Sequence, residues 1–339
     1  MNYIISPLQA ASDQAVVKPK EDVAHYLQQI GFQPLWYNRF IKFEGDGDWA
    51  GRIEGMLGPV QAGEVVIYQT PTYADITIEK YIIEAVHQRH AKIVAFVQDV
   101  EYLRYPELYP KVEWLDYLNS FDVVMVSTTP MAAAIKADGV KRPIIISGPW
   151  GYVEPMTYHQ PSFSRTLHYA GNLMKWKSGF LRHVPASLDV QVYGSENGQT
   201  NLSYPLGPGV TYRGTMSQAE LGLTLTNGFG LIWDEDDQGH YAAYARINQA
   251  HKFSLYLALG LPVIANRESA IGAYIEQNQV GLVIDHLTQL PDVMAAQTEA
   301  TYGPLVDQVK ALSALIRAGR HTQLAALKAV LAAHDITSE

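Results

Sequence analysis

The sequence predicts an α/β protein built from two doubly wound domains of similar size. Short runs rich in valine and isoleucine alternate with helical patterns, and this alternation starts again near the midpoint of the chain. Continuous apolar runs bounded by turn residues are typical of strands buried on both faces of a parallel sheet. The length, 339 residues, also exceeds what a single hydrophobic core usually serves.

In the first half, five apolar runs are predicted to be strands and three amphipathic stretches to be helices. The predicted strands are Tyr3–Ser6, Glu64–Gln69, Lys92–Val97, Phe121–Val126 and Pro143–Ile146. The predicted helices are Lys20–Ile30, Ile76–Arg89 and Pro130–Ala137. Strands that alternate with helices in this way favour βαβ units and a parallel sheet.

A stretch with two prolines and two glycines, Ser147–Pro155, is predicted to link the halves. The predicted strands beyond it are Leu167–Ala170, Asp189–Tyr193, Gly230–Trp233, Pro262–Ala265 and Gly281–Ile284. We therefore expect domains at 1–150 and 151–320, with a C-terminal helix in 321–339 that packs back on the first. Two Rossmann-like domains facing across a cleft describe the GT-B architecture.

Composition excludes several classes of function. The formal net charge is −9, which disfavours a nucleic-acid partner, and the absence of cysteine removes disulfides and thiolate chemistry. No signal peptide and no transmembrane segment is predicted, so we expect a cytoplasmic protein, with attachment to the inner face of the membrane as a further option. The dinucleotide and Walker phosphate-loop motifs are missing, and no Asp-x-Asp pair follows a strand to hold a metal.

Two glutamates, Glu268 and Glu276, have seven residues between them, as in retaining sugar transferases that use nucleotide sugars. In those enzymes the pair precedes a turn that corresponds here to "ALGLPVIA", and the matching positions are Ile247 and Leu255, both apolar. The spacing is therefore an accident. Glu276 is expected to be exposed on a helix, whereas Glu268 follows a strand and either contacts a ligand or is solvated.

Five segments together resemble a narrower group of proteins. In chain order they are "GEVVIYQTPTY" (63–73), "VQDVEYLRY" (97–105), "HYAGNLMK" (168–175), "GFGLIWDED" (228–236) and "HKFSLYLALGLPVI" (251–264). They resemble bacterial galactofuranosyltransferase-like proteins and the third glucosyltransferases of the serine-rich-repeat adhesin pathway. Gln98 departs from that pattern, in which histidine is usual.

This resemblance implies a metal-independent GT-B hexosyltransferase. The donor would be a UDP-sugar, with glucose as the first choice, and the acceptor a glycan on a glycoprotein or a polysaccharide precursor. A β-1,6-galactofuranosyltransferase is the alternative within the class, and a catalytically inactive binding partner of another glycosyltransferase is the alternative outside it. The resemblance also implies a homo-oligomer and no cofactor besides the co-substrate.

Donor-binding candidates lie in the second half. Asn172 follows a strand and is expected to open a helix, and Lys175 and Lys252 lie at helix starts, where cations and backbone N–H groups can bind a diphosphate. A solvated lysine is the alternative at both positions. Tyr193 and Tyr212 end strands and either stack on uracil or pack in the core. The resemblance assigns ribose or phosphate contacts to Asn248 and His251, and Glu268 completes the donor set.

Acceptor-side candidates lie in the first half. Asp99 follows a strand and is either the general base for the acceptor hydroxyl or a helix N-cap. Glu101 and Arg104 are expected to shape the acceptor pocket. The segment 12–22, which contains Ser12, Lys18 and Lys20, resembles the family's loop before its first helix. The resemblance implies that backbone N–H groups of this loop, with Lys18 or Lys20, contact the donor phosphate or the acceptor.

Overall fold

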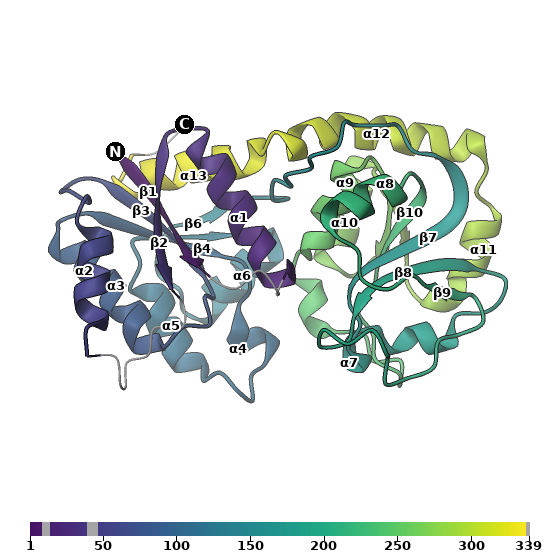
Figure 1. Cartoon of the computed structure of the whole chain (residues 1–339), viewed down its shortest axis with the longest axis horizontal. Helices are drawn as coiled ribbons and strands as arrows, with labels where there is room; N and C mark the ends of the chain where they lie inside the picture. Colours follow the sequence, from purple (N-terminus) through teal and green to yellow (C-terminus); the bar gives the residue numbers. More distant parts are fainter. Residues whose placement is uncertain (9–13, 39–46, 337–339) are drawn as a thin grey trace. The chain divides into compact units, whose positions relative to one another are not determined.

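The computed structural model describes residues 1–8, 14–38 and 47–336 (Figure 1). The chain divides into two compact units, each with its own parallel sheet. Unit 1 comprises Met1–Gly151 and Gly319–Glu339, and unit 2 comprises Tyr152–Ala318. None of the described helices is both long and apolar enough to cross a membrane.

Unit 1 contains a six-stranded sheet in the order β2-β1-β3-β4-β5-β6. Its strands are β1 (Asn2–Leu8), β2 (Phe32–Asn38), β3 (Val65–Thr70), β4 (Lys92–Val97), β5 (Val123–Val126) and β6 (Ile144–Ile146). Its helices are α1 (Gln14–Gln28), α2 (Trp49–Leu57), α3 (Ile76–Gln88), α4 (Glu101–Arg104), α5 (Lys111–Asn119), α6 (Thr129–Asp138) and α13 (Arg320–Ala333). β3 and β4 are buried almost throughout, which explains why both read as continuous apolar runs.

The C-terminal helix α13 belongs to the core of unit 1. It packs against α1 and against strands β3 to β6, through four buried alanines whose small side chains allow a close approach (Figure 1). Two polar contacts fix its first turn: Thr322 Oγ1 accepts from the Gly151 N–H at 3.0 Å, and Gln323 Nε2 donates to the Tyr26 carbonyl at 3.1 Å.

Unit 2 also contains six parallel strands, in the order β12-β11-β10-β7-β8-β9. Its strands are β7 (Ser162–Asn172), β8 (Asp189–Ser195), β9 (Val210–Tyr212), β10 (Asn227–Ile232), β11 (Val263–Asn266) and β12 (Gly281–Ile284). Its α-helices are α7 (Lys175–Ser178), α8 (Gln218–Thr224), α9 (His251–Ala258), α10 (Ala270–Asn278), α11 (Leu290–Ala295) and α12 (Glu299–Arg317). The direction of strand succession reverses between β7 and β10, which makes this the topological switch point of the sheet.

Helix α9 lies unusually close to the sheet of unit 2. A Cβ atom on Gly230 of β10 would come within 2.3 Å of the Tyr256 ring. The Tyr256 hydroxyl in turn donates to the His168 carbonyl at 2.8 Å and accepts from the Ala170 N–H at 2.9 Å. A glycine on β10 and a buried tyrosine on α9 thus hold the helix against β7 and β10.

Two predictions about local structure were wrong. Strand β2 was missed because Pro34 interrupts its apolar pattern, although an edge strand tolerates proline. Helix α1 begins at Gln14 and continues through Pro19, so Lys18 and Lys20 lie within a helix and not in a loop.

Candidate functional site

The candidate site lies at the switch point of unit 2, where open α/β sheets bind their ligands. Gly171, near the end of β7, has a φ of 151°, a conformation that glycine adopts far more readily than other residues. The place that its Cβ would occupy lies 4.0 Å from the Lys252 Nζ. The backbone at the end of β7 is therefore bare on the side that faces this ammonium group.

Two lysines converge on one carboxylate at this point. Lys177 Nζ lies 3.4 Å from Asp234 Oδ2, and Lys252 Nζ lies 3.5 Å from Asp234 Oδ1. Burial acts to raise the pKa of Asp234, but the two ammonium groups outweigh it and hold the pKa below the ordinary value. We call Gly171, Lys177, Asp234 and Lys252 the switch-point cluster.

Lys252 is the most enclosed cation of the cluster. Its side chain is 9% exposed, and its ammonium lies 4.1 Å from the centre of the Tyr169 ring. Burial, reinforced by repulsion from Lys177, lowers the pKa of Lys252 to about 8 against the opposing attraction of Asp234. Because 3.5 Å is long for a hydrogen bond, the ammonium keeps donors for a ligand oxygen.

A small cavity adjoins the cluster. Its volume is about 10 Å³, enough for one water molecule, and its lining includes Asp234, Tyr241, Asn248 and Ser269. The predicted donor residue Asn248 thus lies beside the cluster. Its Oδ1 accepts from the Gln249 N–H at 2.7 Å, which orients the side-chain amide.

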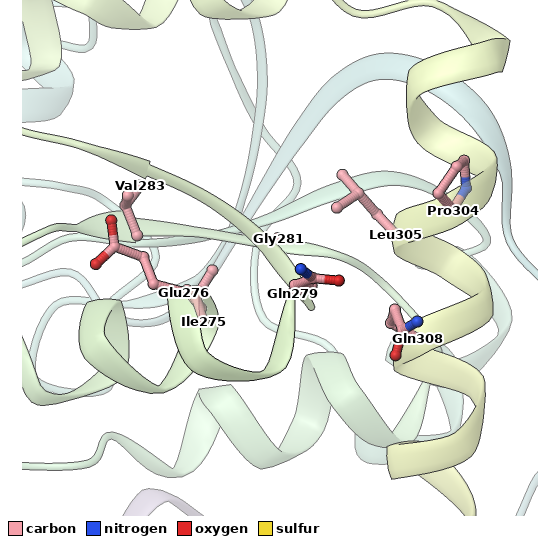
Figure 2. Close-up of a pocket in the computed structure, with 8 residues that line it drawn as sticks. All are labelled: Ile275, Glu276, Gln279, Gly281, Val283, Pro304, Leu305 and Gln308. Atoms are coloured by element: carbon pink, nitrogen blue, oxygen red, sulfur yellow. The ribbon is translucent and has the colours of Figure 1, made fainter.

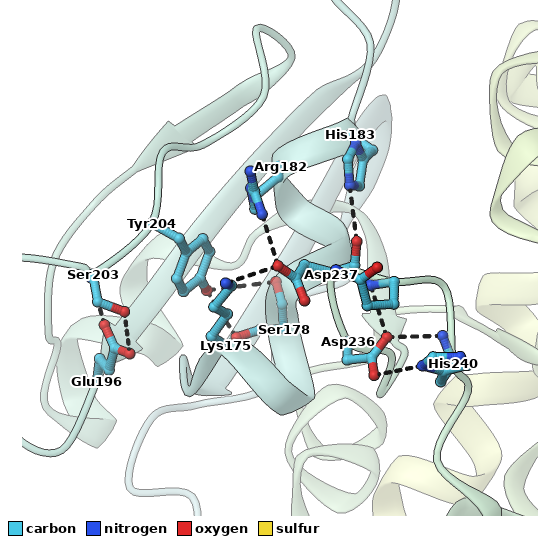
Figure 3. A network of polar contacts seen from close by, with 11 residues as sticks. Lys175, Ser178, Arg182, His183, Glu196, Ser203, Tyr204, Asp236, Asp237 and His240 are labelled. Atoms are coloured by element: carbon cyan, nitrogen blue, oxygen red, sulfur yellow. Dashed lines mark hydrogen bonds and ion pairs between the residues drawn. The ribbon is translucent and has the colours of Figure 1, made fainter.

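The structure places Lys175 apart from this cluster. Its ammonium lies 2.8 Å from Asp237 Oδ2, which Arg182 also contacts at 2.7 Å, and Figure 3 shows the three side chains together. Within the same acidic loop, Asp236 pairs with His240 at 2.9 Å (Figure 3). Lys175 therefore anchors the loop that follows β10, and Lys177, two residues later, is the lysine that reaches Asp234.

Three other donor-side predictions meet different surroundings. Asn172 ends β7 and does not open a helix, because α7 starts only at Lys175 and spans four residues. The Asn172 Oδ1 accepts from the Met174 N–H at 2.9 Å. Tyr193 is buried with its hydroxyl 3.2 Å from His168 Nδ1, so its ring packs in the core. Tyr212 lies on edge strand β9 and donates to the Gly194 carbonyl at 2.7 Å.

The two remaining donor-side candidates, His251 and Glu268, differ in their surroundings. His251 is the first residue of α9, next to Lys252, and its ring packs on Tyr152 with centroids 5.1 Å apart. Glu268 is 67% exposed and pairs with Arg246 at 2.8 Å. Ser269, and not Glu268, caps α10 by accepting from the Gly272 N–H at 2.8 Å. The structure thus favours the solvated interpretation of Glu268.

The acceptor-side candidates of unit 1 gather at the carboxyl end of β4. Arg104 Nη1 donates to Asp99 Oδ2 at 3.1 Å and to Glu101 Oε1 at 3.4 Å. Helix α4 begins after Val100, with no side-chain cap, so Asp99 does not act as the N-cap. Asp99, Glu101 and Arg104 therefore form one charged group.

The N-terminal candidates are distributed differently. Lys20 is buried and donates from Nζ to Gln98 Oε1 at 2.9 Å, at the carboxyl end of β4. Gln98 extends this hydrogen-bond network, because its Nε2 donates to Gln69 Oε1 at 3.1 Å. Lys18 pairs with Asp22 at 2.7 Å one helical turn along α1. Ser12 lies outside the described residues.

Comparison with known protein families decides the relationship. Residues 1–149 match the family model "Glucosyltransferase 3-like, N-terminal domain", and residues 167–329 match "Glucosyltransferase 3-like, C-terminal domain". The chain belongs to the glucosyltransferase 3-like family. It is a glycosyltransferase.

Relatives of this glucosyltransferase 3-like protein include curated enzymes. Glucosyltransferase 3 of Streptococcus gordonii is 28% identical over 320 residues, which cover 92% of this chain and 93% of that protein. Beta-1,6-galactofuranosyltransferase WbbI of Escherichia coli is 28% identical over 163 residues, which cover 46% of this chain and 47% of the relative.

Solved structures establish the fold as GT-B. Anabaena Alr3699/HepE, in complex with UDP and glucose, superimposes with a TM-score of 0.63 at 11% identity and covers 97% of this chain and 99% of that chain. The trehalose-6-phosphate synthase OtsA gives a TM-score of 0.63 at 8% identity with full coverage of both chains. At such low identities the likeness concerns the fold alone.

Two members of the switch-point cluster were missed in the sequence. Lys177 is the second lysine of the motif "KWK", and we selected the first, Lys175. Asp234 opens the acidic run "DEDD", in which the sequence alone does not separate one buried carboxylate from exposed neighbours. In the described part of the chain, no group of three acidic or histidine side chains is arranged to hold a metal ion.

A larger groove of about 330 Å³ lies elsewhere in unit 2 (Figure 2). Residues of α10, β12 and α12 line it: Ile275, Glu276, Gln279, Gly281, Val283, Pro304, Leu305 and Gln308. The groove shares no residue with the switch-point cluster. Its volume therefore does not identify it as the site of the chemistry.

Proposed function

We propose that this glycosyltransferase moves a hexose, with glucose as the first choice, from a UDP-sugar to a glycan on a glycoprotein or polysaccharide precursor. The observation that carries the proposal is the convergence of Lys177 and Lys252 on Asp234 at the switch point of unit 2. Two ammonium groups beside a bare strand end suit a diphosphate, whose oxygens accept charge-assisted hydrogen bonds.

In this proposal unit 2 binds the nucleotide sugar and unit 1 binds the acceptor. Lys252 and Lys177 neutralise the diphosphate. Asn248, just before α9, and His251, its first residue, contact the ribose or the phosphates. Asp99 remains the candidate base for the acceptor hydroxyl. Lys175 has the different task of holding the acidic loop through Asp237.

Asp234 has a specific role in this scheme. Without donor, its carboxylate compensates part of the charge of two enclosed ammonium groups, which burial would otherwise destabilise. With donor, the diphosphate supplies the missing negative charge. We propose that the lysines do the work that a divalent cation does in other enzymes, so that no metal ion is needed.

Isothermal titration with UDP in the presence of EDTA tests the proposal. Binding in EDTA supports it, and binding that appears only after manganese is added contradicts the metal-independent site. Release of UDP from UDP-glucose, UDP-galactose, UDP-galactofuranose and UDP-N-acetylglucosamine then identifies the sugar. The match to the galactofuranosyltransferase WbbI favours UDP-galactofuranose as the second candidate donor.

A further inference from the structure

Two side chains from neighbouring loops meet at the carboxyl edge of the sheet in unit 1. Strands β3 and β4 are parallel neighbours, so Tyr73, which follows β3, and Glu101, which follows β4, leave the same edge. The Tyr73 hydroxyl donates to Glu101 Oε1 at 3.1 Å. Arg104 Nη1 approaches the same oxygen at 3.4 Å.

The second carboxylate oxygen of Glu101 is unsatisfied. Glu101 is 1% exposed, and its Oε2 is buried without a hydrogen-bond partner among the residues that the structure describes. Such an oxygen is costly, because it has lost water and gained nothing in return. Burial also raises the pKa of Glu101, against the opposing charge of Arg104. A ligand hydroxyl that donated to Oε2 would remove this cost.

Tyr73 is held in an unusual conformation. Its φ is 59°, in the left-handed region that bulky side chains rarely adopt. It is nevertheless 44% exposed, so an aromatic surface is offered to solvent while its hydroxyl is fixed by Glu101. Strain of this kind concentrates at ligand-binding positions.

We propose that Tyr73 and Glu101 form a subsite for a neutral sugar of the acceptor. The C–H face of the sugar packs on the electron-rich face of the Tyr73 ring, and one sugar hydroxyl donates to Glu101 Oε2. A neutral sugar fits better than an anion, because Asp99 and Glu101 outnumber the single cation Arg104 in the group. The hydroxyl reaches Oε2 once the Arg104 side chain moves aside, while the Tyr73 ring stays in place. This subsite rests on the proposed function, since it supplies its acceptor.

Saturation-transfer NMR on the full chain, with a panel of methyl glycosides of glucose, galactose and N-acetylglucosamine at millimolar concentrations, tests the subsite. We expect at least one glycoside to bind the wild type, with the strongest transfer to protons of one ring face. Tyr73→Ala and Glu101→Gln should each weaken that binding about fivefold or more. Tyr73→Phe, which keeps the ring, should weaken it less than Tyr73→Ala does.

Matched controls are available in the same unit. Trp36 is an aromatic residue of similar exposure, 41%, on β2, and Glu107 is an exposed glutamate near α4. Trp36→Ala and Glu107→Gln should bind the glycoside as the wild type does. Absence of any glycoside signal with the wild type, or equal binding by Tyr73→Ala, Glu101→Gln and the controls, overturns the subsite.

Titration with UDP separates this failure from failure of the proposed function. The Tyr73 and Glu101 variants should bind UDP with wild-type affinity, because the proposed donor site lies in unit 2. A wild-type circular-dichroism spectrum and unfolding midpoint show that unit 1 of each variant is folded. If the wild type binds UDP but the subsite variants bind glycosides normally, only the subsite is wrong. If the wild type binds no UDP, the donor site is wrong, whatever the glycosides do.

Discussion

At the scale of the residue, Lys252 is the side chain on which donor binding depends. Its ammonium is enclosed by Tyr169, Asp234 and the end of β7, so few solvent molecules can compensate the loss of its contact with a phosphate oxygen. Hydrogen bonds to charged groups contribute about 1.5–3 kcal/mol. We therefore expect Lys252→Met to raise the Kd for UDP about 10- to 100-fold, as measured by isothermal titration.

Lys310, exposed on α12, supplies the control for that measurement. Lys310→Met changes charge and length in the same way and should leave the affinity unchanged. Equal affinity of the wild type and Lys252→Met would remove Lys252 from the site.

The pKa of Lys252 gives a second prediction at this scale. Because that pKa is lowered to about 8, the ammonium of the free protein loses its proton as the pH rises through 8. A diphosphate binds the protonated form, so the affinity for UDP should be full near pH 7 and decline above pH 8. Titrations from pH 7 to about pH 9.5 stay above the second pKa of phosphate, which is near 6, so the charge of the phosphate itself does not change.

Lys252→Met is the comparison for this pH series. Its weaker binding should no longer decline over the same range, because the titrating group is gone. An identical decline in the wild type and the variant would assign the pH dependence to another group.

At the scale of the element, the close approach of α9 to β10 is a feature of stability. Gly230→Ala would place a methyl group within 2.3 Å of the buried Tyr256 ring, so helix or strand must shift. Overpacking of this kind costs about 1–3 kcal/mol. We expect a lower midpoint of denaturant unfolding for Gly230→Ala, with a weaker affinity for UDP because Lys252 moves with α9.

Gly55 provides the matched glycine. It lies exposed in α2, and a Cβ there would meet nothing within 4 Å. Gly55→Ala should stabilise the protein by about 0.5–1 kcal/mol, because alanine favours a helix. Destabilisation of similar size by both substitutions would show that contact with Tyr256 is not the cause.

Most elements could be predicted from the sequence, because buried strands and amphipathic helices leave strong patterns. Strands β4 and β12 match their predicted bounds, and α3 differs by one residue. Strand β2 was missed because its proline breaks the pattern, and the start of α1 because Pro19 imitates a loop. A sequence pattern reports only on neighbouring residues. Whether a proline is tolerated in β2 or α1 depends on where that element lies in the folded unit.

The site was less predictable than the fold. The sequence indicated Lys252 because a helix start carries a recognisable pattern, but the partner that it shares with Lys177 is contributed by a different strand end. Whether Lys175 or Lys177 points toward the switch point depends on the geometry of a four-residue helix. Residue patterns do not reveal which side chains from segments distant in sequence come into contact.

At the scale of the whole molecule, the two units have separate cores and separate sheets. A ligand that binds one unit should therefore stabilise that unit first. UDP at about 100 times its Kd adds about 2.7 kcal/mol to the species that binds it. We expect hydrogen exchange, measured by mass spectrometry, to slow in peptides of β7, β10 and α9 and to change little in peptides of β1 and β3.

The Lys252→Met variant, measured at the same UDP concentration, should show less of this protection, about 1.4 kcal/mol for a 10-fold and about 0.4 kcal/mol for a 100-fold weaker Kd. Equal slowing in both sheets of the wild type would mean that the units respond to the nucleotide as one cooperative body.

The attachment of α13 to unit 1 has a consequence for biosynthesis. A chain grows from its N-terminus, and domains generally fold as units when their residues have emerged. Unit 1 needs Arg320–Ala333 to cover its sheet, so its core stays incomplete until those residues have left the ribosome. Unit 2, whose residues are contiguous, is complete earlier. The half that is translated first is thus the half that matures last.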